Sequence, residues 1–168
     1  MKIKNLILIF AVIATTFSSC KKEAGPTGPA GTNGNANVTS LTFTNPITGG
    51  TLWYDTLKGV TYQSISSSLV LAYIQDANCG NNWYSMPGWG CGANYAGRFY
   101  TAQVGGTDTT TTMAYLELLN PDGSYGVSSQ TLTKLRVIVA PAGTTLTGKK
   151  EIDYADYKAT CRYFNIGE

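Results

Sequence analysis

The chain has 168 residues, with 12 lysine and arginine residues, 10 aspartate and glutamate residues and no histidine. Without histidine, Ser-His-Asp and Cys-His catalysis, histidine-ligated zinc and the commonest proton carrier near neutral pH are all excluded. The basic side chains do not cluster as a nucleic-acid interface requires, so we expect no nucleic-acid partner.

The first predicted element is a secretion signal in residues 1–19. Two lysines precede an apolar run at residues 6–14, and small residues then lead to Cys20. This run is too short to cross ~30 Å of hydrocarbon as a permanent helix, and its order is that of a cleaved signal. Phe-Ser-Ser-Cys at residues 17–20 resembles a bacterial lipobox, which predicts acylation of Cys20. The alternative is an ordinary cleaved signal followed by a coincidental cysteine.

The residues around the predicted cleavage site also indicate where the protein resides. Several acyl chains on one cysteine hold a protein stably on a membrane. Lys21 and Lys22 stand where an aspartate often retains lipoproteins at the inner membrane, so we expect the outer membrane, on either its periplasmic or its cell-surface side. Removing residues 1–19 takes away two lysines and leaves a formally neutral protein, with 10 basic and 10 acidic residues.

Residues 20–37 form the second predicted region, a disordered tether that begins at the acylated cysteine. Glycine recurs at every third position from Gly25 to Gly34, which is the collagen pattern. Four triplets are too few to hold a triple helix alone, so we interpret residues 21–37 as a spacer that extends about 50 Å at about 3.1 Å per residue. A stalk that joins three copies of the chain is the alternative.

Residues 38–168 form the third predicted region, a β-rich domain. Short runs rich in threonine and tyrosine alternate with Gly, Asn, Pro and Asp, which is typical of strands and turns. A turn is predicted at residues 120–123. The predicted strands are 41–44, 52–54, 60–62, 69–74, 98–104, 111–119 and 134–140. This spacing predicts an all-β fold, an antiparallel β-sandwich or a jelly-roll-like domain.

One short C-terminal helix interrupts the strand pattern. Asp153 is the predicted N-cap of this helix, and the charge of Asp156 suits its first turn. Tyr154, Tyr157, Cys161 and Phe164 follow at spacings of three and four residues. We expect this stripe to pack on the sheet.

The cysteines of the β-rich domain indicate one disulfide. Cys79 and Cys91 bracket an aromatic, glycine-rich loop, and a bond between them in an oxidising compartment would stabilise the domain by about 3 kcal/mol. Cys161 is either a buried free thiol or the partner of one of these two. No CxxC unit is present, so we expect no metal site.

Several of these pieces together resemble a recurring kind of small bacterial lipoprotein. Such proteins have a lipobox, a few Gly-Pro-rich triplets and a β-rich domain that ends in a short helix. The matching pieces are Cys20, residues 25–33, 35–38, 69–73 and 83–87, the strand 135–140 with the proline after it, and residues 152–157. The cysteines at 79, 91 and 161 depart from this group. The resemblance implies an envelope lipoprotein and carries over no catalytic or binding residue.

The aromatic loop motivates our first functional hypothesis, a non-enzymatic envelope or surface module that binds a ligand, with carbohydrate as the favoured class. Trp83, Tyr84, Trp89 and Tyr95 lie among glycines and asparagines, and aromatic faces beside amide groups suit sugar rings. A disulfide would preorganise the loop. In the alternative interpretation Trp83 and Tyr84 belong to a strand and fill the core, which leaves only Trp89 exposed.

Two further hypotheses belong to other classes of protein. The triplets and a threonine-rich run at 107–112 motivate a structural protein that assembles with itself or with envelope partners. A hydrolase would need two carboxylates across a cleft, and the strand-associated candidates are Asp55, Asp76, Asp108 and Glu117. Calcium would be held near Asp76 or Asp122, although no EF-hand-like spacing occurs. We expect a protein that is not an enzyme and has no cofactor.

Overall fold

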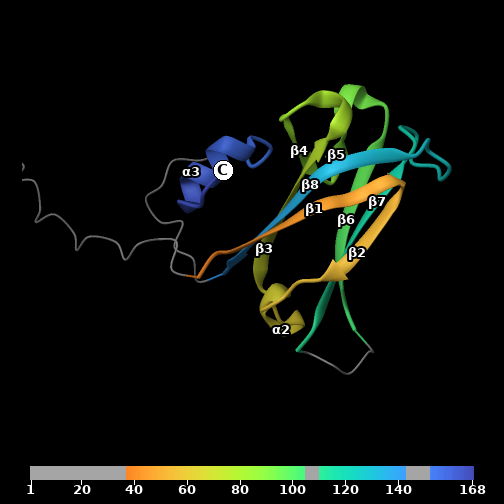
Figure 1. Ribbon diagram of the computed structural model, residues 1–168. Helices are drawn as coiled ribbons and strands as arrows, with labels where there is room; N and C mark the ends of the chain where they lie inside the picture. Colours follow the sequence, from red (N-terminus) through yellow and green to blue (C-terminus); the bar gives the residue numbers. More distant parts are fainter. Residues whose placement is uncertain (1–36, 105–109, 143–151) are drawn as a thin grey trace, which may run out of the picture. The chain divides into compact units, whose positions relative to one another are not determined.

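The strands of the computed structural model form two antiparallel four-stranded sheets (Figure 1). The structure describes residues 37–104, 110–142 and 152–168, all within the compact unit Thr32–Glu168. The predicted signal, Cys20 and most of the predicted tether lie outside the described residues. The predicted fold class, an antiparallel β-sandwich with one short C-terminal helix, is confirmed.

Each sheet draws its strands from distant parts of the sequence. The first sheet contains, in spatial order, β1 (Thr39–Gly50), β8 (Gln130–Pro141), β3 (Ser68–Asp76) and β4 (Trp83–Met86). The second sheet contains β2 (Leu52–Thr56), β7 (Thr112–Leu119), β6 (Ala96–Gln103) and β5 (Gly88–Trp89). The described helices are α2 (Tyr62–Ile65) and α3 (Tyr157–Phe164), with 3-10 turns η1 (Ala77–Cys79) and η2 (Cys91–Ala93).

The main hydrophobic core fills the space between the two sheets. Alternate residues of β7, Ala114, Leu116 and Leu118, are buried there. They share one cluster with Leu135 and Val137 of β8 in the other sheet. Because side chains alternate along a strand, the inner faces of both sheets supply this core.

A second, smaller core covers the outer face of the first sheet. Tyr73 of β3 and Ile138 of β8 point outward, where Tyr157, Cys161 and Phe164 of α3 bury them. This arrangement explains why the predicted central strand at residues 69–74 is apolar on both faces, and it confirms that the helical stripe packs on a sheet.

Two local predictions were wrong. The predicted cap Asp153 is not the N-cap of α3; Asp156 is, and its Oδ1 accepts a hydrogen bond from the Ala159 amide at 3.0 Å. Asp153 instead closes the preceding turn by accepting from the Ala155 amide. The predicted strand at 60–62 is the entry to α2, because Thr61 accepts a hydrogen bond from the Ser64 amide and so caps a helix.

Candidate ligand-binding groove between β4 and α3

The disulfide predicted between Cys79 and Cys91 is confirmed. Their Cα atoms lie 5.9 Å apart, and the bond joins η1 to η2. Cys161 is a buried free thiol in the second core, so the predicted alternative in which it pairs with one of these cysteines is wrong. The disulfide fixes both ends of the segment that carries β4 and β5.

Tyr95 is fully buried, so its predicted role in ligand binding is wrong. Its hydroxyl donates to Oδ2 of Asp76 at 2.8 Å, and Oδ1 of Asp76 accepts from the Asn78 amide. Burial and this hydrogen bond raise the pKa of Tyr95. A Cβ at Gly90 would lie 2.0 Å from the Tyr95 ring, so only glycine fits at that position. The Tyr95–Asp76 pair therefore has a structural role in the folded domain.

The other three predicted aromatic residues are separated rather than gathered. Trp83 lies on the outer face of β4 and stacks on Tyr157 of α3, with ring centroids 4.3 Å apart. Tyr84, the next residue, packs against the core between the sheets. Trp89 is 54% exposed and pairs with Ala96 on the second sheet. Strand alternation sends neighbouring side chains to opposite faces, which is why these aromatic residues form no single loop surface.

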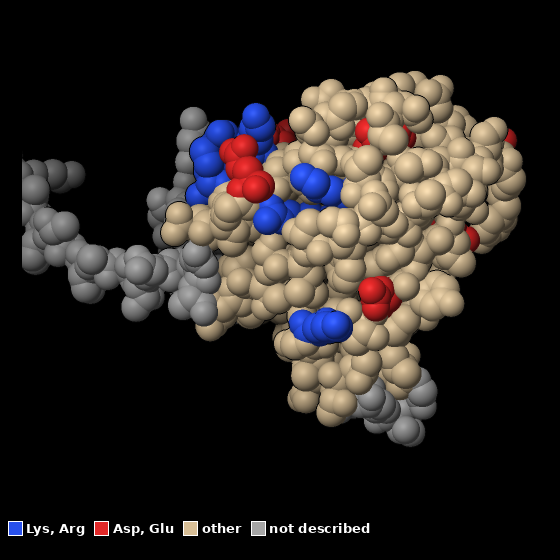
Figure 2. Space-filling view, viewed as in Figure 1, with Lys and Arg blue, Asp and Glu red and all other residues tan. Residues whose placement is uncertain are grey.

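A groove of about 580 Å³ runs between the start of β4 and the N-terminal end of α3. One wall contains Trp83 and Tyr84, with the amides Asn81 and Asn82 before them. The opposite wall is the segment Ala155, Asp156, Tyr157 and Lys158. Figure 2 shows charged side chains of both signs gathered over α3, on a face that is otherwise largely uncharged.

Hydrogen bonds fix the wall formed by residues 81–84. The side-chain amide of Gln75, on β3, donates to the carbonyl of Asn81 at 3.0 Å. The nearby bond from Cys79 to Cys91 restrains the same segment. This wall is therefore held in place without a ligand, which lowers the entropy cost of binding.

A second set of contacts fixes the wall formed by α3. The Tyr73 hydroxyl donates to the Tyr154 carbonyl at 2.6 Å and contacts the Thr160 hydroxyl at 2.9 Å. Arg136 donates to the Tyr157 hydroxyl and to the Gly167 carbonyl, and its guanidinium lies over the Tyr157 ring. Burial raises the pKa of Tyr157 to about 12, so this hydroxyl stays protonated well above neutral pH.

The carboxylates proposed for hydrolysis or calcium are dispersed and have structural partners. Glu117 pairs with Arg98, and Asp55 accepts from the Thr56 amide. Asp122 accepts from Ser124 in a turn, which lowers the pKa of its carboxyl. Asp108 lies outside the described residues. Within residues 37–104, 110–142 and 152–168, no three His, Cys, Asp or Glu side chains are grouped for a metal ion.

The groove combines an aromatic wall with groups that donate and accept hydrogen bonds. Asn81 and Asn82 carry both donors and acceptors, Lys158 only donates and the Asp156 carboxylate only accepts. Asp156 is the one carboxylate among the described lining residues, so they do not supply the pair that a glycosidase needs. The arrangement suits binding of a polar ligand that has an apolar face.

Comparisons with protein-family models, curated proteins and solved structures found no match. Among the described residues, no helix has both the length and the apolar character needed to cross a membrane.

Sequence analysis located one wall of the groove and missed the other. Trp83 and Tyr84 were predicted to bind a ligand and do line the groove. The segment 155–158 was interpreted only as a helix start that packs on a sheet. Its stripe indicated packing, but nothing in the spacing indicated which strand it would meet.

Proposed function

We propose that this protein is an acylated lipoprotein of the bacterial outer membrane whose β-sandwich binds carbohydrate without catalysing a reaction. The lipobox-like sequence that ends at Cys20 supports the membrane anchor. The groove between β4 and α3 supports the binding role, and it is the observation on which the proposal rests.

The chemistry of the groove matches that of a sugar ring. A pyranose has an apolar face, which packs on aromatic surface such as the part of Trp83 that Tyr157 leaves uncovered, and a rim of hydroxyls. Each hydroxyl both donates and accepts, and Asn82, Asp156 and Lys158 offer the matching groups. The groove volume of about 580 Å³ lies in the range of about 300–1,000 Å³ typical of small-ligand sites.

Affinity electrophoresis of the detergent-solubilised full-length protein tests the binding role. Native gels containing mannan, xylan or mixed-linkage β-glucan would be run with Asn82→Ala, Lys158→Ala and the unmodified protein. We expect at least one polysaccharide to retard the unmodified protein and the two variants to lose about tenfold in affinity, because each loses a hydrogen bond to a sugar hydroxyl.

Lys134→Ala and Asn94→Ala are the matched controls, because both residues are exposed and neither lines the groove. We expect both controls to be retarded like the unmodified protein. Equal retardation of all variants and controls in every gel would contradict the role of the groove.

The anchor is tested separately by growing cells with labelled palmitate. We expect the unmodified protein to carry the label in the outer-membrane fraction and Cys20→Ser to carry none. Label retained by Cys20→Ser, or an unmodified protein without label, would contradict acylation at this residue.

A further inference from the structure

The outer face of the second sheet carries a row of three tyrosines. Tyr54 of β2, Tyr115 of β7 and Tyr100 of β6 are directly opposite one another in the strand register. Tyr100 and Tyr115 stack with centroids 4.9 Å apart and planes 6° apart, and Tyr54 follows at 6.0 Å from Tyr115. Tyr54 is 62% exposed and Tyr100 is 40% exposed. The two outer rings of this row are therefore open to solvent, and the middle ring, Tyr115, is half-buried between them.

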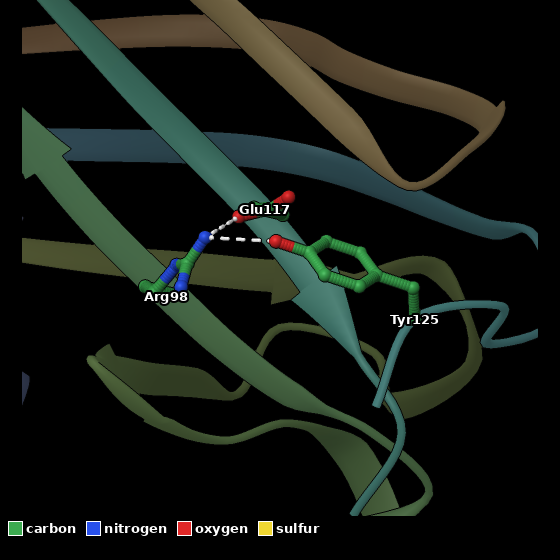
Figure 3. A network of polar contacts seen from close by, with 3 residues as sticks. All are labelled: Arg98, Glu117 and Tyr125. Carbon is green, nitrogen blue, oxygen red and sulfur yellow. Dashed lines mark hydrogen bonds and ion pairs between the residues drawn. The ribbon is translucent and has the colours of Figure 1, made fainter. Parts of the chain in front are cut away.

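A charged pair lies next to this row, two residues along the strands. Arg98 and Glu117 are opposite each other in the register and form an ion pair, and Arg98 also bonds the Tyr125 hydroxyl at 3.3 Å (Figure 3). The Arg98 guanidinium lies 5.7 Å from the centre of the Tyr100 ring. Because the two charges cancel, the pair offers donors and acceptors without net charge.

A further aromatic residue lies beyond the charged pair on the same face. Gly97 is buried against Met86 and Phe99 packs on the core, so strand alternation directs Ala96, Arg98 and Tyr100 outward. Trp89 is opposite Ala96 and therefore shares this outer face. Ala96 and Tyr100 are four residues apart along β6, which is about 13 Å at about 3.3 Å per residue.

This arrangement is not needed to complete the core. The inner face of the second sheet already supplies the cluster that contains Leu116 and Leu118. Tyr54 and Trp89 on the opposite face are exposed, so they contribute little hydrophobic free energy to folding. Exposed aromatic side chains that recur on one sheet face, here the tyrosine row and, beyond the charged pair, Trp89, are typical of an interaction site.

We propose that this aromatic face, formed by Tyr54, Tyr100, Tyr115, Arg98, Glu117 and Trp89, is a second carbohydrate site that binds a neutral polysaccharide chain lying along the strands. Sugar rings contact the exposed edges of the tyrosine row at one end and the Trp89 ring at the other, and hydroxyls between them contact Arg98 and Glu117. Because the Arg98–Glu117 pair has no net charge, the face favours a neutral chain over a polyanion. The inference rests on the carbohydrate class proposed above but uses different residues.

The test uses the full-length protein in detergent and the same three polysaccharide gels, with the variants Tyr54→Ala and Trp89→Ala. We expect each to weaken polysaccharide binding about three- to tenfold, because one ring contact is lost. Raising the salt to 0.5 M should leave binding unchanged, since the chain is neutral. The matched control is Leu69→Ala, an exposed apolar residue on the first sheet, which should bind like the unmodified protein.

The outcomes separate the two proposed sites. Weaker polysaccharide binding by Tyr54→Ala and Trp89→Ala supports the second site, whether or not the groove variants Asn82→Ala and Lys158→Ala also bind more weakly. Loss confined to Lys158→Ala and Asn82→Ala overturns the second site and leaves the groove. Binding abolished by salt would also overturn it, as would light scattering in which the unmodified protein is dimeric and the face variants are monomeric without any change in polysaccharide binding. If no form of the protein binds any polysaccharide, both proposals fall.

Discussion

The outer faces of the two sheets use the same kinds of side chain in opposite ways. On the first sheet, Tyr73 and Trp83 lie beneath Tyr157 of α3, and the Tyr73 hydroxyl is hydrogen-bonded inside the protein. On the second sheet, Tyr54 and Tyr100 remain exposed. An aromatic strand face is therefore part of a core only when another element covers it, and an uncovered face stays available to a partner.

The largest effect should come from removing a ring with which α3 packs on the first sheet. Phe164→Ala should lower the free energy of unfolding by about 3–5 kcal/mol, because a fully buried aromatic side chain leaves a cavity. Tyr54→Ala on the exposed face should change it by no more than about 0.5 kcal/mol. Urea unfolding followed by tryptophan fluorescence measures both. Equal losses of stability in the two variants would contradict this difference between the covered and the exposed face.

Alkaline pH should destabilise the protein through the tyrosines buried between α3 and the first sheet. An ordinary tyrosine has a pKa near 10, whereas burial raises that of Tyr157 to about 12 and also raises that of Tyr73. Between these values the unfolded chain has released protons that the folded chain retains, so stability falls as pH rises from about 10 to about 12. Urea midpoints at several pH values measure the fall, which should be shallower in Tyr157→Phe. A midpoint that does not change over this range would contradict the prediction.

The smallest effect concerns the start of α3. Asp156→Ala should cost about 1 kcal/mol, because the Ala159 amide loses its acceptor. Asp153→Ala is the matched control in the preceding turn and should cost less, because its bond to the Ala155 amide lies outside the helix. Urea unfolding of both variants decides the order, and the reverse order would restore Asp153 as the more important cap.

Local patterns in the sequence predicted the fold better than they predicted the surfaces. Strand alternation and turn residues indicated a β-sandwich, and the spacing of Tyr157, Cys161 and Phe164 indicated a helix that packs on a sheet. Such signals depend on neighbours within about one turn or one strand. The error at Asp153 arose because Asp156, three residues later, could also cap the helix. The error at Val60 arose because the Thr61 side chain caps a short helix in a segment whose residue types are typical of a strand.

The tyrosine row could not be predicted in the same way. Tyr54, Tyr100 and Tyr115 belong to three separate strands, and they align only through the register of β2 and β6 on β7. No spacing within one segment encodes that register. For the same reason Trp89 was assigned to a loop with Tyr95, although Tyr95 lies in the main core and Trp89, opposite Ala96, is exposed on the outer face of the second sheet.

The position of β8 has a consequence for how the domain is made. β8 is the last described strand in the sequence, yet it lies between β1 and β3 in the first sheet. A chain that is synthesised from its N-terminus therefore cannot complete this sheet until residue 141 has emerged from the ribosome. Until then β1 and β3 expose unpaired edges, which are sites for aggregation. Folding of the first sheet is thus a late event when the chain emerges N-terminus first, and α3, which follows β8, closes over a sheet that has only just formed.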